Sequence, residues 1–283
     1  GLLLPPSTVL IVSALLTEAS VGRLLLAGVL PGSLLTLLFI ATVFAVSVLN
    51  PRAGPPGERI PLGERFRVLM NSGALIFVVA IVIGGIYAGV FTVTEAAAVG
   101  AGLTFLHALW TRRMTVARFF GALLDTIKTT AMVFFILIGA HFFATLLALT
   151  RIPVNLADAV GELAIPALAV LLVIILVYIV LGTFMEGFAM MVLTVPIVLP
   201  IIMELGYDPI WFGIIVVLVI EMGLISPPVG LNVFVVKGVA PNVPLGEIYR
   251  GILPFWCAMG LCVALLVTFP QIALMLPDTM LGR

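Results

Sequence analysis

Long apolar runs separated by short polar turns make up most of the chain, and they do not show the alternation typical of membrane β-barrel strands. A helix needs about 20 apolar residues to cross the hydrocarbon core of a bilayer. The runs therefore predict an all-α polytopic membrane protein. The expected spans are residues 24–49, 69–91, 95–110, 129–149, 164–182, 188–203, 211–240 and 251–273, and residues 1–16 are expected to end a further span.

Composition supports a membrane protein and argues against other classes. Of the 283 residues, 63% are hydrophobic and only 9% are charged, and the mean hydropathy is +1.35. Soluble domains carry about 25% charged residues. The formal net charge is zero, which provides no field for attracting nucleic acid. The opening "GLLLPPSTVL" lacks the basic leader of a signal peptide, and we expect the chain to be N-terminally truncated.

The distribution of basic residues predicts the orientation in the membrane. The loop of residues 50–68 and the turn "TRRMTVAR" are separated by two expected spans, so they share one side, which the positive-inside rule makes cytoplasmic. The turns near residues 18–23, 151–162 and 204–208 then face outward. Ten of the 13 Lys and Arg are thereby placed inside (Arg52, Arg59, Arg65, Arg67, Arg112, Arg113, Arg118, Lys128, Lys237 and Arg250), and Arg23, Arg151 and Arg283 are placed outside.

Two stretches of the chain repeat each other. "GLLLPPSTVLIV" at the start returns as "GLISPPVGLNVF", and "VGRLLLAGVLPG" is echoed by "LGEIYRGILPF" in the same order. The predicted orientation makes the two copies run in opposite directions, which is the inverted repeat common in secondary transporters. We expect the end of a first repeat at residues 1–49, a basic cytoplasmic linker at 50–68 and a second repeat at 69–283. The second repeat would hold a hairpin at about 164–203, a broken helix at about 211–240 and a last span at 251–273.

The prolines of the repeated stretch predict broken helices. Proline removes an N–H and clashes with the preceding turn, which places the second break at Ser226. Carbonyl groups freed inside a membrane need partners, and a cation is a suitable one. Gly223 and Gly230 would allow close approach, and the Ser226 and Asn232 side chains would add oxygens. Ser7 and Thr8 would do the same in the first copy. The alternative is a plain proline kink stabilised by neighbouring helices.

A second polar interruption, "GTFMEG", lies between two apolar helices. Gly182 and Gly187 flank Thr183 and Glu186, which suggests the tip of a re-entrant helical hairpin. A carboxylate inside a membrane is a functional-site hypothesis by default. If the flanking helices are instead two full spans, Glu186 is an ordinary surface carboxylate.

Other polar residues have weaker implications. Glu221, one turn before the break, could support it, and Glu95 after two threonines is interpreted as a helix-capping residue. His107 and His141 are interpreted as packing or interfacial residues. Residues 113–128 form an amphipathic helix that fits either a cytoplasmic surface arm or the wet end of the next span.

Four motifs together resemble the large permease (M, or DctM-like) subunit of TRAP transporters. They are "GLLLPPS…AGVLPG", "GGIYAGVFTVTEAAAVGA", "FMEGFAMMVLTVPIVLPI" and "GYDPIWFGIIVVLVIEMGLISPPVGLNVFVVKGVAPNVPLGEI", and the similarity runs through the whole chain. Val93 replaces the proline usual in the family's "TPTEAAA". In the family a hairpin precedes the first broken helix, and we expect this truncated chain to lack it.

The resemblance implies an elevator-type permease in a bacterial inner membrane. It would import an organic anion, such as a C4-dicarboxylate, keto acid or sialic acid, with sodium as the coupling ion. A periplasmic binding protein and a small membrane subunit would be its partners. One implied sodium site comprises Gly182, Thr183, Glu186, Gly187, Gly223, Ser226, Pro227 and Gly230; a second, partial site comprises Gly1, Pro5, Pro6 and Ser7; substrate is expected near Ser7, Glu186 and Asn232.

Three other functions are alternatives for a membrane protein of this kind. A stand-alone sodium- or proton-coupled anion carrier of the same superfamily would have the same membrane architecture without a binding protein. An intramembrane enzyme is disfavoured because no HExxH or other paired catalytic spacing occurs. An ion channel is disfavoured by the inverted broken helices, which are typical of carriers.

Overall fold

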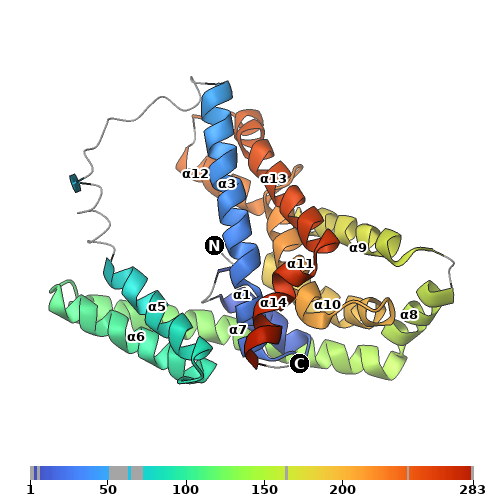
Figure 1. Ribbon diagram of the computed structural model, residues 1–283, viewed down its shortest axis with the longest axis horizontal. Helices are drawn as coiled ribbons and strands as arrows, with labels where there is room; N and C mark the ends of the chain where they lie inside the picture. Colours follow the sequence, from blue (N-terminus) through green and yellow to red (C-terminus); the bar gives the residue numbers. More distant parts are fainter. Residues whose placement is uncertain are drawn as a thin grey trace. The chain divides into compact units, whose positions relative to one another are not determined.

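The computed structural model describes residues 3–4, 7–50, 63–64, 73–162, 165–240 and 242–281. Every regular element in these ranges is a helix (Figure 1). The chain divides into two compact units, one comprising Gly1–Ala53 with Ile136–Arg283 and the other Gly54–Phe135. Among the described helices, four are long and apolar enough to cross a membrane, in agreement with an all-α polytopic membrane protein: Val21–Leu49, Val116–Leu147, Gly187–Glu204 and Leu245–Thr268.

Helix α11 (Pro209–Leu224) forms the core of the larger unit. Asp208 caps it, because its Oδ1 accepts from the backbone N–H groups of Ile210 and Trp211 at 2.7 and 3.2 Å, and Pro209 occupies the first turn. Nearly all of its residues are buried against α9, α1, α10, α13 and α2. The Trp211 indole N–H donates to the Leu266 carbonyl at 2.8 Å and joins α11 to α13.

A helical hairpin packs against this core. Helix α9 (Ala167–Gly182) and helix α10 (Gly187–Glu204) are joined by the four-residue turn 183–186. Helix α9 packs mainly on α11, and α10 packs on α8 (Ile152–Glu162). The expectation of a turn at residues 151–162 was wrong: after Arg151, which has a positive φ of 53°, the chain forms the helix α8.

The expected break in residues 211–240 is confirmed as an interruption of the helix. Helix α11 ends at Leu224 and α12 (Leu231–Val239) begins after Gly230. Helices α9 and α11 have 16 residues each, or about 24 Å at 1.5 Å per residue, which is shorter than the roughly 30 Å hydrocarbon core. Both are therefore shorter than the four described helices that are long enough to cross a membrane.

A short helix begins inside each of the two repeated stretches, and longer helices come after it. Helix α1 (Thr8–Leu16) and α12 have nine residues each. They are followed by α2 (Val21–Ala27) with α3 (Val29–Leu49), and by α13 (Leu245–Thr268). Helices α3 and α13 lie side by side (Figure 1), with the rings of Phe39 and Phe255 edge to face at 5.5 Å. The inverted orientation of the two copies and the proposed domain boundaries stay predictions.

Helix α14 (Gln271–Leu281) was not expected from the sequence, which predicted a single last span to residue 273. The chain leaves α13 at Phe269 and starts α14 after Pro270. Helix α14 packs on α2, α3 and α11. Asp278 on α14 forms an ion pair with Arg23 on α2, with 2.9 Å between the Asp278 Oδ1 and the Arg23 Nη2, and both side chains are partly exposed.

The smaller unit contains α5 (Gly73–Tyr87) and α6 (Val93–Trp110), which pack on each other. It also contains the first part of α7 (Val116–Thr150). The capping role expected for Glu95 is confirmed: its Oε2 accepts from the Thr92 N–H at 2.8 Å, and the Thr92 hydroxyl accepts from the Glu95 N–H at 3.3 Å. From Val116 onward, the amphipathic stretch 113–128 continues without interruption into the next expected span as one helix, α7. Most of the basic linker 50–68 lies outside the described residues.

Candidate functional site

The tip of the hairpin meets the end of α11 through two glycines. A Cβ atom on Gly182 would lie 2.9 Å from the Gly223 Cα, and one on Gly223 would lie 2.6 Å from the Gly182 Cα. Both distances are too short for any side chain, so the backbones of α9 and α11 touch here. Gly187, at the start of α10, also faces α11, since a Cβ there would lie 3.1 Å from the Ile220 side chain.

A backbone hydrogen bond joins the hairpin turn to the break. The Gly230 N–H donates to the Thr183 carbonyl at 3.3 Å. Gly230 has a φ of +57°, a left-handed conformation that favours glycine, and a Cβ there would lie 2.8 Å from the Ser226 carbonyl oxygen. Thr183 is buried, and its hydroxyl donates to the Val180 carbonyl at 2.8 Å. The structure therefore brings Gly182, Thr183, Gly223 and Gly230 together.

Helix α13 contacts the break from another side. The Tyr249 hydroxyl lies 3.0 Å from the Pro228 carbonyl oxygen and 2.8 Å from that of Val229, and its single O–H proton is shared between these two acceptors. The Trp256 indole N–H donates to the Ser226 hydroxyl oxygen at 2.7 Å. These two aromatic residues were not predicted, because 20 to 30 residues separate them from their partners and no local pattern marks such a contact.

Ser226, proposed as a ligand, is almost fully engaged by the protein. It is buried, and its hydroxyl donates to the Met222 carbonyl at 2.6 Å while it accepts from Trp256. A hydroxyl has one donor and two acceptor positions. One lone pair of Ser226 is therefore left over. Pro227 is exposed and joined to Pro228 by a cis peptide bond.

Glu186 and Asn232 lie apart from this buried contact. Glu186 is the N-cap of α10: its Oε2 accepts from the Ala189 N–H at 3.0 Å, and the residue is exposed in the isolated chain. Asn232 is an exposed residue in the first turn of α12. The capping role of Glu186 was missed, because glutamate is not among the residues preferred at this position.

The first repeated stretch is described only in part. Gly1, Pro5 and Pro6 lie outside the described residues. Ser7 is buried and caps α1, with its hydroxyl oxygen accepting from the Leu10 N–H at 3.2 Å. A cavity of about 300 Å³ lies between Leu3 and Leu4, the helices α3 and α13, and the end of α11. Its polar side chains are Thr36 and the half-buried Glu221.

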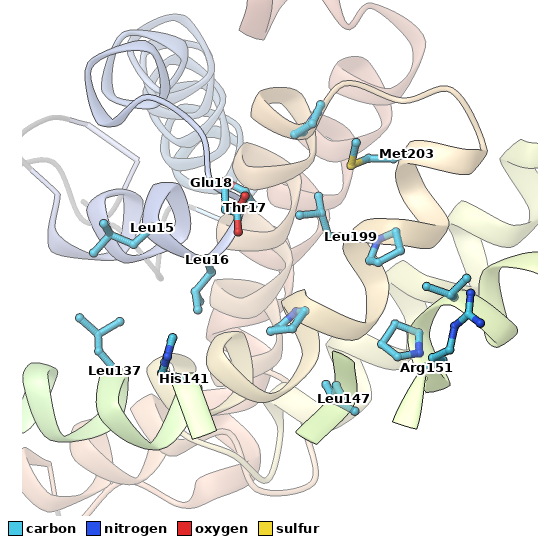
Figure 2. Close-up of a pocket in the computed structure, with 15 residues that line it drawn as sticks. Leu15, Leu16, Thr17, Glu18, Leu137, His141, Leu147, Arg151, Leu199 and Met203 are labelled. Atoms are coloured by element: carbon cyan, nitrogen blue, oxygen red, sulfur yellow. The ribbon is translucent and has the colours of Figure 1, made fainter. Parts of the chain in front are cut away.

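A larger cavity of about 770 Å³ lies where α1, α7, α8 and α10 come together. Figure 2 shows Thr17 and Glu18 from the end of α1, His141 from α7 and Arg151 at the α7–α8 junction among its lining residues. The remaining wall consists mainly of leucine and proline side chains. His141 therefore contributes a polar group to a cavity that is mostly apolar.

Comparison with known proteins shows which protein family the chain belongs to. The family model described as "Tripartite ATP-independent periplasmic transporter, DctM component" matches residues 1–272. The chain belongs to the DctM family. Among similar proteins, the C4-dicarboxylate TRAP transporter large permease protein DctM of Pseudomonas aeruginosa is 41% identical over 280 residues, which is 98% of this chain and 65% of that protein.

Other DctM relatives carry different substrate names. The sialic acid TRAP transporter large permease protein SiaM of Vibrio cholerae is 34% identical over all of this chain and 66% of its own length. The isethionate TRAP transporter permease protein DctMQ of Oleidesulfovibrio alaskensis is 34% identical over 95% of this chain and 42% of its own length. This DctM chain thus spans just under two thirds of the length of the first two relatives.

Proposed function

We propose that this DctM chain is part of the large permease subunit of a tripartite, sodium-coupled secondary transporter. The transporter would sit in the inner membrane of a bacterium and import a small organic anion of the C4-dicarboxylate, keto acid or sialic acid class. The observation that carries the proposal is the contact between a hairpin tip and a broken helix, in a chain matched by the DctM model over residues 1–272. The names of the relatives support the substrate class.

The break fits sodium chemically. Two consecutive prolines prevent two N–H groups from occupying carbonyls of the preceding turn, and sodium is a hard cation that takes oxygen ligands. The C-terminal end of α11 adds the negative end of a helix dipole. Among the described residues no three His, Cys, Asp or Glu side chains gather as a transition-metal site would need. The proposed site comprises Gly182, Thr183, Glu186, Gly187, Gly223, Ser226, Pro227 and Gly230.

A second sodium site and a substrate site complete the proposal. The former would use Gly1, Pro5, Pro6 and Ser7, of which only Ser7 is described. Substrate would bind near Ser7, Glu186 and Asn232. A periplasmic binding protein would deliver it, a small TRAP membrane subunit would accompany the permease, and the hairpin with the broken helix would move as an elevator.

The test is uptake of a labelled C4-dicarboxylate or sialic acid by the complete transporter in proteoliposomes. Uptake should require an inward sodium gradient, the binding protein and the small subunit. Uptake without the two partners would favour the stand-alone carrier, and uptake driven by a proton gradient alone would refute sodium coupling.

Variants locate the site. Ser226→Ala and Glu186→Ala should raise the sodium concentration needed for half-maximal uptake. Ser33→Ala, which loses a similar hydroxyl bonded to the Val29 carbonyl on the exposed surface of α3, should leave it unchanged. If Ser226→Ala and Glu186→Ala both behave like the control, the proposed sodium site is in the wrong place.

A further inference from the structure

Helix α13 reaches the break with two hydrogen-bond donors on one of its faces. Tyr249 and Trp256 are about two helical turns apart, so their side chains point in nearly the same direction. Tyr249 donates to the Pro228 and Val229 carbonyls, and Trp256 donates to the Ser226 hydroxyl. The two donors therefore bracket residues 226–229, where the prolines interrupt the helical hydrogen bonds.

We propose that Tyr249 and Trp256 are positioning residues for the sodium site. They hold residues 226–229 in the arrangement that leaves the remaining oxygens available to a cation on the side of the hairpin. The inference rests on the proposed sodium coupling and adds to it two residues that contact no ion themselves.

The proposal follows from which oxygens of the break already have protein partners. The Pro228 and Val229 carbonyls are turned to α13, and the Ser226 hydroxyl keeps one lone pair after binding Met222 and Trp256. On the other side of the break, the Thr183 carbonyl accepts one hydrogen bond and has a second lone pair. The contacts from α13 thus fix the direction in which the oxygens of residues 226–229 point, and that direction decides which of their remaining lone pairs face the hairpin.

Space beside the break would let it rearrange if the donors were removed. A cavity of about 430 Å³ is lined by Ile179 of α9, by Ser226 and Pro227, and by Tyr249 and Trp256. Tyr249 is the side chain that holds the Pro228 and Val229 carbonyls toward α13, so without its hydroxyl the segment is free to turn these carbonyls elsewhere. A binding-competent arrangement that is populated only part of the time raises the apparent dissociation constant in inverse proportion to its population.

The test uses Tyr249→Phe and Trp256→Phe in the complete, reconstituted transporter. Each keeps an aromatic ring and removes the donor. Each should raise the sodium concentration for half-maximal uptake roughly threefold to tenfold, as expected for losing one net hydrogen bond. The maximal rate and the substrate KM at saturating sodium should stay near wild type, which separates positioning from a general loss of folded protein.

Two matched variants lose comparable bonds elsewhere in the same unit. Tyr178→Phe removes the hydroxyl that accepts from Thr194 at 2.8 Å within the hairpin, and Trp211→Phe removes the donor to the Leu266 carbonyl at 2.8 Å. Both should leave the half-maximal sodium concentration unchanged. If the Tyr249 and Trp256 variants shift it no more than these controls, the proposal is overturned.

Hydrogen–deuterium exchange distinguishes this inference from the proposed function. Peptides covering residues 225–230 should exchange faster in Tyr249→Phe and Trp256→Phe than in the two controls. If wild-type uptake is independent of sodium, the coupling proposal fails and the assignment to a sodium site fails with it. Faster exchange would then still support the anchoring of the break by α13, and unchanged exchange would refute that too.

Discussion

Replacing Gly223 by alanine tests the contact on which the candidate site is built. The added Cβ would lie 2.6 Å from the Gly182 Cα, 3.0 Å from its carbonyl carbon and 3.0 Å from the Ile179 carbonyl oxygen. All three are backbone atoms, so no side-chain rotation can relieve the overlap. Because carbon atoms in contact prefer about 3.5–4.0 Å, α9 and α11 must separate by about 1 Å.

The separation has two energetic consequences. Overpacking of this kind costs about 1–3 kcal/mol. The hydrogen bond from Gly230 to Thr183, already 3.3 Å long, would be lost as well. Its loss would lower the free energy of unfolding by a further amount of about 0.5–1.5 kcal/mol. Gly223→Ala should therefore lower the free energy of unfolding by about 2–4 kcal/mol.

The assay compares thermal unfolding of the purified protein in detergent with sodium-dependent uptake after reconstitution. Gly260→Ala is the matched control, because its Cβ would lie 3.8 Å from the Met222 methyl group, an ordinary contact between α13 and α11. Gly223→Ala should lower Tm and uptake, and Gly260→Ala should change neither. Wild-type Tm and uptake in Gly223→Ala would refute the backbone contact and the site derived from it.

Three further experiments have defined outcomes. Gly230→Ala should lower the free energy of unfolding by about 1–2 kcal/mol, because Gly230 has a left-handed φ and lies close to a carbonyl. The measurement is Tm. The control is Gly238→Ala in α12, whose added Cβ would meet nothing within 4 Å and which should leave Tm unchanged. A double-mutant cycle of Arg23→Ala and Asp278→Ala should give a coupling below about 1 kcal/mol, since the pair is partly exposed; a larger value would mean that the pair is shielded from water. Thr92→Ala should lower helix stability by about 1 kcal/mol through loss of the capping box, visible as faster amide exchange in the first turn of α6, and unchanged exchange would contradict it.

The broken helix and the hairpin could be predicted from sequence because their causes are local. Two consecutive prolines interrupt a helix wherever they occur inside it, and the break before Gly230 follows from them. The turn between Gly182 and Gly187 likewise separates two apolar runs that are each long enough to be recognised. The capping box at Glu95 is a local pattern of the same kind.

Features that depend on distant partners were not predictable in this way. The roles of Tyr249 and Trp256 exist only because α13 returns to the break after the loop that follows α12. Helix α8 was expected to be a turn, and its packing on α10 joins two elements that are separated along the chain by α9. Helix α14 was merged with the preceding span, because the apolar sequence continues across Phe269 and Pro270.

The contact between Gly182 and Gly223 has a consequence for how this part of the fold can vary. Two glycine backbones in contact present no side chain, so this point of the molecule carries no chemical identity that substitution could vary by degrees. Relatives are named for transport of C4-dicarboxylates, sialic acid and isethionate. A junction made only of backbone offers no side chain through which it could differ between such proteins: a substitution either preserves the contact or removes it.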